Sequence, residues 1–220
     1  MQRIPEPELM DEEKQALAYA QADFEEPNNQ FVETFLSLFG QPSGTMLDLG
    51  CGPADIPLRF ARQANELRII AVDGAPAMIE LANQTLSQDA DARARIETVC
   101  ASIQELRLPP QSCDAVISNS LLHHLHEPSA FWDTIRHCSR TGAAVLIMDL
   151  CRPQGRAEAQ DIVDTYAVDE PAVLRKDFFN SLLAAFTPEE VEQQLTATGL
   201  CELRVKQSSD RHWIAYGILQ

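Results

Sequence analysis

A paired-glycine turn is the part of the sequence best suited to bind a ligand. The segment LDLGCGPAD occupies residues 47–55, and its glycines are Gly50 and Gly52. Two glycines allow a tight turn and let the backbone approach a ligand without a clash from Cβ atoms. The N–H groups at the start of the helix that follows point to the same place. We therefore expect this turn to hold one end of a cofactor.

Two acidic residues in this segment narrow the choice of ligand. Asp48 lies two residues before the first glycine, where a carboxylate disfavours a pyrophosphate and suits an ammonium or sulfonium group. Asp55 occupies the position of the third glycine of the dinucleotide fingerprint, where close packing of helix on strand leaves no room for a side chain. Both residues argue against a nicotinamide dinucleotide and favour a cationic ligand.

A third acidic residue, Asp73, ends the next apolar segment and is followed by Gly74. It comes after Gly52 at about the interval at which an acid at a strand end binds both hydroxyls of a ribose. Asp73 therefore predicts an adenosine moiety, although it does not decide which cofactor carries it. The alternative is an ordinary surface turn in which an aspartate precedes a glycine.

Three histidines follow a later apolar segment, in the run SLLHHLH over residues 120–126. Their His-His-x-His spacing in a loop differs from the i, i+4 pairs that bind zinc on helices, so we expect no metal. A histidine can accept a proton near neutral pH. His124 is our first candidate for a base or for a group that orients a substrate, and His123 is the second.

The elements that must position these residues alternate along the chain. Apolar strands alternating with helices indicate a parallel sheet that is covered on both faces, with right-handed crossovers. The sequence thus predicts a doubly wound α/β fold of the Rossmann-like kind. The expected strands occupy residues 46–49, 68–73, 95–100, 114–119 and 143–150, and the expected helices occupy residues 53–64, 76–86 and 128–138.

Residues 151–186 interrupt this alternation with a mostly helical insert, which could cover the strand ends as a lid. Its polar and aromatic residues could line a pocket, whereas Phe178, Leu182 and Phe186 also have the spacing of a helix core. The candidates for the pocket are Tyr166, Arg175, Lys176, Phe178, Phe179 and Asn180. Asp149 and Arg152, at the start of the insert, could contact the acceptor or pair with each other, and we favour the pairing.

The end of the chain predicts a helix and an antiparallel hairpin. Thr187, Pro188 and Glu190 form a strong helix start, and Gly199 ends that helix. Strands over residues 200–207 and 212–219 would then complete a seven-stranded sheet. Within a single domain, we divide the chain into an N-terminal helical cap (1–44), a cofactor-binding core (45–150), the insert (151–186) and the final helix and hairpin (187–220).

The N-terminal part predicts two helices. One is expected around residues 11–24, and a second is expected to be capped by Asn28 or Asn29, with an apolar stripe that runs to Phe39. Gly40 is expected to end the second helix in a left-handed conformation.

Composition excludes several classes of partner. The chain has 220 residues and a net charge of −16, and such an acidic surface repels nucleic acid and anionic lipid. The six cysteines are scattered without a metal-binding spacing, which fits reduced thiols in a cytoplasmic protein. No apolar run is long enough to span a bilayer, and the first residues do not read as a signal peptide. An apolar face on the insert would allow a homodimer.

Residues 47–54, 72–78 and 118–125 together resemble the class I methyltransferases that depend on S-adenosylmethionine (SAM). The likeness is greatest to the small-molecule branch that contains the ubiquinone and menaquinone biosynthesis methyltransferases. It runs from about residue 45 to 150, and the C-terminal hairpin is similar to the reversed seventh strand of that family. The resemblance implies methyl transfer from SAM to a small-molecule acceptor, with S-adenosylhomocysteine (SAH) as product. It does not reveal the acceptor or the atom that is methylated.

The resemblance also implies roles for the residues of the glycine turn and of the next strand end. Asp48, Gly50 and Gly52 would hold the methionine end of SAM. Asp73 would bind the ribose hydroxyls, and Gly74 would leave room for the adenosine.

Further roles follow from the same resemblance. Met78 would pack near the adenine, and Asn119 would face the methionine part through its backbone. Ala101 and Ser102 stand where the family often has Gly-Asp, so the Ser102 hydroxyl would replace the acid that meets the adenine amino group. Tyr19 is similar to a cap-helix tyrosine that reaches the cofactor carboxylate.

Two other functions stay open at this point. A nicotinamide-dependent oxidoreductase is opposed by Asp48, by Asp55 and by the C-terminal hairpin. A non-catalytic protein that binds SAM on the same fold would keep the glycine turn and Asp73. Methylation of nucleic-acid bases is disfavoured by the charge, and residues 118–120 read Ser-Asn-Ser instead of the Asn/Asp-Pro-Pro-Tyr of enzymes that flip a base.

Overall fold

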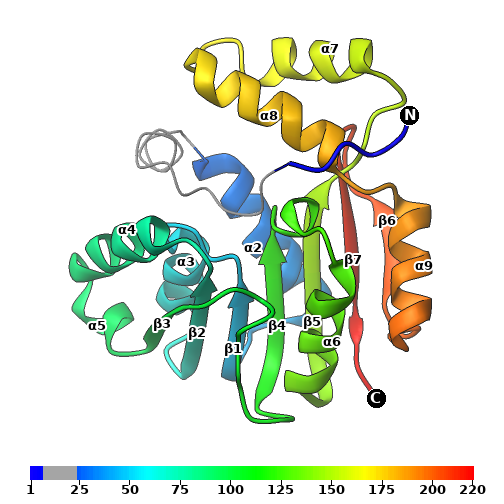
Figure 1. Ribbon diagram of the computed structural model, residues 1–220. Coiled ribbons are helices and arrows are strands. Elements are labelled where there is room, and N and C mark those ends of the chain that lie inside the picture. The colour runs from blue at the N-terminus through cyan, green and yellow to red at the C-terminus, as the bar shows by residue number, and fades with distance from the viewer. Residues whose placement is uncertain (7–23) are drawn as a thin grey trace.

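The computed structural model describes residues 1–6 and 24–220, and its centre is one seven-stranded sheet (Figure 1). The strand order is β3-β2-β1-β4-β5-β7-β6. Strands β1 to β5 are parallel, whereas β7 runs antiparallel to both β5 and β6. The strands are β1 Gly44–Leu49, β2 Leu67–Asp73, β3 Ile96–Cys100, β4 Cys113–Asn119, β5 Ser139–Leu150, β6 Arg204–Gln207 and β7 His212–Ile218. This arrangement confirms the doubly wound fold and its antiparallel C-terminal hairpin.

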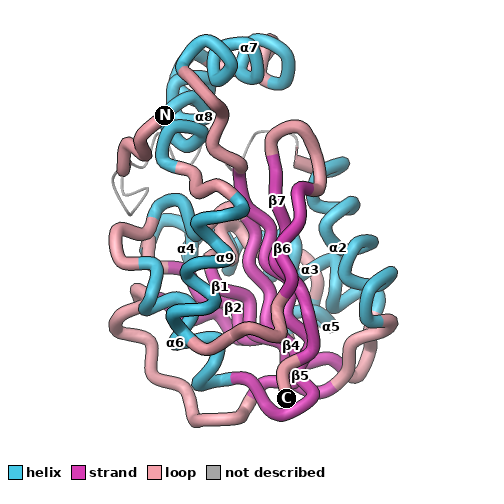
Figure 2. The backbone as a smooth tube through the Cα atoms, turned by 90° about the vertical axis from the view of Figure 1, so that its right-hand side faces the viewer, coloured by secondary structure: helices cyan, strands magenta, loops and turns pink. Residues whose placement is uncertain are grey.

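Side chains of a strand alternate between the two faces of the sheet. Both faces carry apolar residues here, and helices cover each of them. One core joins α2, α3 and α4 to residues such as Met46 and Ile117, and the other joins α6 and α9 to residues such as Leu47 and Val116. Figure 2 shows α2 and α3 on one side of the sheet and α6 and α9 on the other. The helices are α2 Glu25–Phe39, α3 Asp55–Gln63, α4 Pro76–Ser87, α5 Ala90–Arg93, α6 Pro128–Cys138, α7 Arg156–Tyr166, α8 Ala172–Ala184 and α9 Pro188–Thr198, with a 3₁₀ turn η1 at Leu122–His124.

The start of α2 corrects the sequence prediction. The helix begins at Glu25, so Asn28 and Asn29 lie inside it and do not cap it. Asn28 Nδ2 donates to Asp55 Oδ2 at 2.7 Å, and Asn29 accepts from Arg59, so both amides link α2 to α3. The helix predicted around residues 11–24 lies almost wholly outside the described residues.

Smaller corrections concern three element ends. Strand β5 begins at Ser139, four residues earlier than predicted, and β6 is limited to Arg204–Gln207. Gly40 has a φ of 77° but a ψ of −162°, so it ends α2 with a positive φ and without the left-handed helical conformation.

The insert forms a helical pair beyond the carboxyl ends of the parallel strands (Figure 1). Helices α7 and α8 share a small core that includes Ile162, Val163 and Leu182, and residues 167–171 separate them. The first six residues, which we call the N-terminal strap, run beside this pair, where Ile4 N donates to Leu183 O at 3.0 Å. The insert is therefore attached to the other end of the chain.

Helix α9 begins as the sequence predicts. The Thr187 hydroxyl accepts from Glu190 N, and the Glu190 carboxylate accepts from Thr187 N at 3.0 Å, which completes a capping box. Gly199 closes the helix in the left-handed conformation. Within the described parts of the chain, no helix has the length and apolar character needed to cross a membrane.

The capping box gives a stability prediction. Replacing Thr187 by alanine leaves an N–H of the first turn without its acceptor, so we expect Thr187→Ala to lower the free energy of unfolding by about 1 kcal/mol. Denaturant titration measures this change. Thr196→Ala is the matched control, since its exposed hydroxyl only donates to the Glu192 carbonyl. Equal losses in the two variants would show that the cap contributes nothing.

Candidate cofactor and acceptor site

A cavity of about 460 Å³ lies between the carboxyl ends of the central strands and the insert. In an open α/β sheet this edge is where ligands bind. Six residues from the predicted cofactor set line the cavity: Gly50, Gly52, Asp73, Gly74, Met78 and Asn119. The structure thus brings together side chains and turns from β1, β2, α4 and β4.

The two glycines of the turn are needed for different reasons. Gly50 has a φ of 78°, and a Cβ there would lie 2.9 Å from the Leu121 Cβ, so the chain after β4 packs directly on it. Gly52 has a φ of 52° and open space around it. Gly50 N and Cys51 N both donate to Val72 O, at 2.8 and 2.9 Å, which ties the turn to β2.

Asp73 connects the glycine turn to the start of α4. One carboxylate oxygen accepts from Gly52 N and the other from Ala75 N, each at 2.9 Å. Burial raises the pKa of Asp73, and these two N–H groups act in the opposite direction. The carboxylate also lines the cavity, so a ligand hydroxyl can reach oxygens that the backbone already orients.

Asp48 lies behind the turn and not among the residues that line the cavity. Its exposed fraction is only 2%, and burial together with the charge of Asp73 raises its pKa to about 8. A cation bound at the turn would stabilise the ionised form of this carboxyl through space, without direct contact.

Two predicted cofactor residues, Ala101 and Ser102, lie outside the lining of the cavity. Ala101 N donates to Asp73 O at 3.0 Å. The Ser102 hydroxyl donates to Glu105 Oε2 at 2.8 Å, within a turn. Tyr19 lies outside the described residues.

His123 forms a buried ion pair with Asp149. Its Nδ1 lies 2.5 Å from Asp149 Oδ1, and its backbone N donates to Asp149 Oδ2 at 3.0 Å. Burial opposes a charge on the imidazole, but the attraction and hydrogen bond of Asp149 outweigh it and raise the pKa of His123. The predicted pairing of Asp149 with Arg152 is wrong, because Arg152 turns to Glu190 at 2.6 Å.

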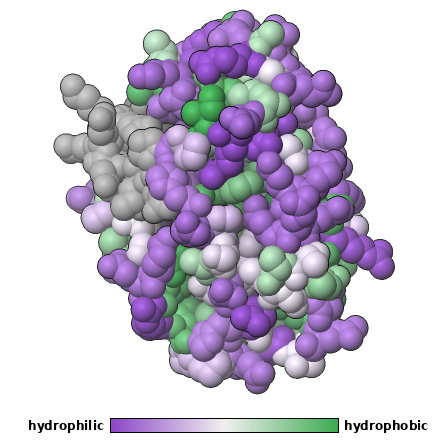
Figure 3. Space-filling view, turned by 45° about the vertical axis from the view of Figure 1, so that its right-hand side comes forward, coloured by the Kyte–Doolittle hydropathy of each residue, from purple (hydrophilic) through white to green (hydrophobic). Residues whose placement is uncertain are grey.

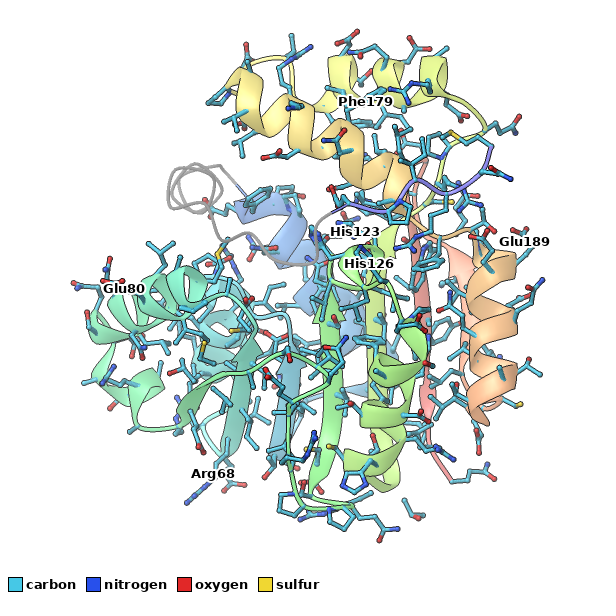
Figure 4. The ribbon with its side chains drawn as sticks, viewed as in Figure 1. Arg68, Glu80, His123, His126, Phe179 and Glu189 are labelled. Carbon is cyan, nitrogen blue, oxygen red and sulfur yellow. The ribbon has the colours of Figure 1, made fainter. Side chains whose placement is uncertain are left out.

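Glu6 of the N-terminal strap lies between both histidines and α8. Its Oε1 is 3.3 Å from His124 Nδ1 and 3.6 Å from His123 Nε2, and it accepts from the Ser181 hydroxyl at 2.9 Å. Figure 4 shows His123 and His126 below the strap and α8. Sequence reasoning missed Glu6, which lies in an acidic stretch without a motif.

Arg3 fixes the strap in place. Its guanidinium donates to the backbone carbonyls of Ala184, His123 and Leu125, at 2.5, 2.7 and 3.0 Å. It also lies 4.1 Å from the centre of the Phe186 ring. Arg3 therefore joins the end of α8 to the turn η1, which we call the histidine turn because it carries His123 and His124. Glu6 follows Arg3 by three residues.

Glu6, His123 and His124 have the composition of a metal site, with ligand atoms within 4.8 Å of one another. These groups, however, already have partners: Glu6 accepts from the Ser181 hydroxyl, and His123 Nδ1 is bound to Asp149. A divalent ion would add positive charge and would compete with the proton that the ion pair favours on His123. The sequence expectation that no metal is bound here stays a prediction.

The far end of the cavity is lined by the insert and by the β6–β7 turn. Of the six insert residues proposed for a pocket, Tyr166 and Phe178 line the cavity, whereas Arg175, Lys176, Phe179 and Asn180 do not. The Tyr166 hydroxyl donates to Asp210 Oδ2 at 2.5 Å, and the Arg211 guanidinium lies 3.4 Å from the centre of the Tyr166 ring. These contacts hold the end of α7 against the hairpin.

Comparison with known proteins gives a family match for the central part of the chain. Residues 47–147 match the family described as a methyltransferase domain. The chain is 34% identical over 92 residues to a carboxy-S-adenosyl-L-methionine synthase of Trichlorobacter lovleyi, a match that covers 41% of this chain and 37% of the relative. The chain therefore spans less than half the length of the curated relatives it matches.

Solved structures share the fold over almost the whole chain. A SAM-dependent methyltransferase from Aquifex aeolicus has a TM-score of 0.69 at 15% identity, covering 95% of this chain and 99% of that one. A phosphoethanolamine N-methyltransferase 2 from Haemonchus contortus, in complex with SAM, has a TM-score of 0.72 at 17% identity, covering 95% of this chain and 57% of that one. At these identities the likeness establishes the fold.

The raised pKa of Asp48 predicts a pH dependence of stability. Between the ordinary carboxyl pKa near 4 and the folded value of about 8, the folded state holds a proton that the unfolded state lacks. This group therefore lowers the free energy of unfolding as pH rises through that window, by up to about 1.4 kcal/mol per pH unit. We expect Asp48→Asn to gain stability over the wild type progressively from about pH 5 to 8.

Denaturant titrations at several pH values measure this difference. Asp91→Asn, at an exposed position on α5, is the control and should follow the wild type. A constant gap between Asp48→Asn and the wild type over this range would contradict the assignment.

Proposed function

We propose that the chain transfers a methyl group from SAM to a small-molecule acceptor, starting from the match of residues 47–147 to the methyltransferase domain family. The observation that carries the proposal is Asp73, whose carboxylate is oriented by the glycine turn and lines the cavity. SAM and SAH both present two ribose hydroxyls that this carboxylate suits.

The residues present fit SAM better than a nicotinamide dinucleotide. The Asp73 carboxylate lines the cavity, and a bound sulfonium would also favour ionisation of the buried Asp48 behind the turn, whereas a pyrophosphate would oppose it. Gly52 leaves the backbone open to close approach of a ligand, Gly50 and Gly74 also line the cavity, and Met78 offers an apolar contact for the adenine. When bound, SAM would supply an electrophilic methyl group on a positively charged sulfur.

The chain's own contribution to the transfer is mainly to position two reactants. Holding donor and acceptor in line lowers the barrier by removing their relative freedom before reaction. A base is needed only when the acceptor arrives with a proton on the reacting atom. His124 lines the cavity and has the Glu6 carboxylate at its Nδ1, so we assign that role to His124. His123, held by Asp149, positions the turn.

The acceptor would be bound by the part of the chain that lies outside the family match. The match ends at residue 147, whereas α7, α8 and the β6–β7 turn form the far wall of the cavity. The match therefore gives no reason to assign the reaction of the Trichlorobacter relative to this chain. Membership of the ubiquinone and menaquinone branch, a cytoplasmic location and a homodimer also stay predictions.

Calorimetric titration with SAH, with NADH in parallel, tests the cofactor. We expect SAH to bind with a dissociation constant of about micromolar size and NADH not to bind. Binding of NADH alone would overturn the proposal. A non-catalytic protein that binds SAM would pass this test, and only turnover of an acceptor separates it from an enzyme.

The role of Asp73 has its own prediction. Asp73→Ala should weaken SAH binding by roughly 1.5–3 kcal/mol, the scale for losing hydrogen bonds to a charged group. Asp91→Ala on the exposed helix α5 should bind as the wild type does. A folded Asp73→Ala protein with unchanged affinity would refute the assignment of the adenosine site.

Chelation tests the expectation that no metal is required. EDTA should change neither the SAH affinity nor the melting temperature, because Glu6 already accepts from Ser181 and His123 is already bound to Asp149. Zinc chloride added to the EDTA-treated protein should then give the same small shift in wild type and in His124→Gln. A stabilisation by zinc that His124→Gln abolishes would establish a metal site.

A further inference from the structure

We propose that the acceptor is a protonated amine, held by Asp177 and deprotonated by His124. The inference rests on the proposed methyl transfer and adds the substrate class. Asp177 lies on α8, lines the cavity and stands one helical turn before Ser181, which binds Glu6.

The Asp177 carboxylate has an unused acceptor atom. Its Oδ2 is buried and has no hydrogen-bond partner among the residues that the structure describes. A buried oxygen without a donor is costly, and such atoms in native structures call for an explanation. A ligand with N–H groups, bound in the cavity, would supply the missing donor.

The charges around the cavity favour a cation. Four carboxylates line it, those of Glu26, Asp73, Glu170 and Asp177. Two of the lining groups, Arg211 and His123, can carry positive charge, but Arg211 is paired with Asp210 at 3.0 Å and His123 with Asp149. Burial and the neighbouring Arg211 lower the pKa of a further lining residue, His212, to about 4, so it is neutral at pH 7.

This excess of negative charge selects among acceptors. A carboxylate, phosphate or phenolate would be repelled by the lining, whereas an ammonium group is attracted and donates up to three hydrogen bonds. An alcohol could also donate to Asp177 Oδ2, but it would gain no coulombic attraction. Phe178 lines the cavity from the same helix, and an aromatic ring suits an ammonium group.

A protonated amine cannot attack until it has lost a proton. The His124 imidazole would take that proton from the ammonium nitrogen, with its charge stabilised by Glu6, 3.3 Å from Nδ1. The freed lone pair then forms the new N–C bond as the bond from methyl to sulfur breaks, and that bond's electron pair stays on sulfur. The products are the methylated ammonium ion and the neutral thioether SAH, and His124 releases its proton to water.

Three probes of similar shape test the charge preference: benzylamine, benzyl alcohol and benzoate, each titrated into the SAH-loaded protein. We expect benzylamine to bind about tenfold or more tighter than benzyl alcohol and benzoate to bind most weakly, as expected for a charge held in a partly buried site. Asp177→Asn should lose that preference and keep its SAH affinity. Asp169→Asn, exposed in the same insert, should keep both.

The His124 role is tested by transfer of labelled methyl from SAM to benzylamine. His124→Gln should lower the rate at pH 7 by about 10²-fold or more, the range for a general base. The defect should shrink above the pKa of the amine, because the substrate then arrives without its extra proton. A merely structural histidine would give a defect that does not depend on pH.

The outcomes of these experiments distinguish the amine assignment, the role of His124 and the proposed function. Equal binding of the three probes, binding of none, tighter binding of the alcohol or benzoate, or an unchanged preference in Asp177→Asn overturns the amine assignment while SAH binding still supports methyl transfer. A pH-independent defect in His124→Gln overturns the role of His124 as base. Failure of SAH itself to bind overturns the proposed function, and the amine assignment with it.

Discussion

The two hydrogen bonds that Asp73 accepts are the constraint on which the cofactor end of the structure depends. A buried carboxylate is unfavourable unless donors compensate it, and here Gly52 N and Ala75 N do so. The same bonds fix the glycine turn relative to β2 and α4. Burial, and next the charge of Asp73, raise the pKa of Asp48, so a cation near the turn would favour ionisation of this second carboxyl. The floor of the cavity is therefore arranged for a cation.

The acceptor end is built in a different way, from segments far apart in the sequence. Arg3 and Glu6 come from the first residues, Asp177 from the insert and Arg211 from the hairpin. The Arg3 contacts bind α8 to the histidine turn. The position of α8, which forms one wall of the cavity, is therefore coupled to the position of His124. Hydrophilic residues dominate the outer face in Figure 3, with hydrophobic residues in small separate areas, so this face offers no extended apolar surface for a partner.

The sequence predicted what depends on local pattern. Strand periodicity, the turn at Gly50 and the acid at Asp73 lie within one βαβ unit, where the spacing along the chain determines the geometry. The errors concern partners that meet only in the folded chain: Asn28 binds Asp55 on the next helix instead of capping its own, and Asp149 selects His123 over Arg152. Neither partner is marked by spacing, so no local rule could have found it.

The proposed cofactor and the proposed acceptor would both be cations in the same cavity. The same negative field that attracts a sulfonium attracts an ammonium ion, yet two cations in one cavity repel each other along the line on which the methyl group must move. Loss of a proton from the amine removes this repulsion and creates the nucleophile in one step. A base that faces the cavity would meet this need. We propose His124 for the role, since it lines the cavity, has Glu6 at its Nδ1 and lies next to the buried pair of His123 and Asp149.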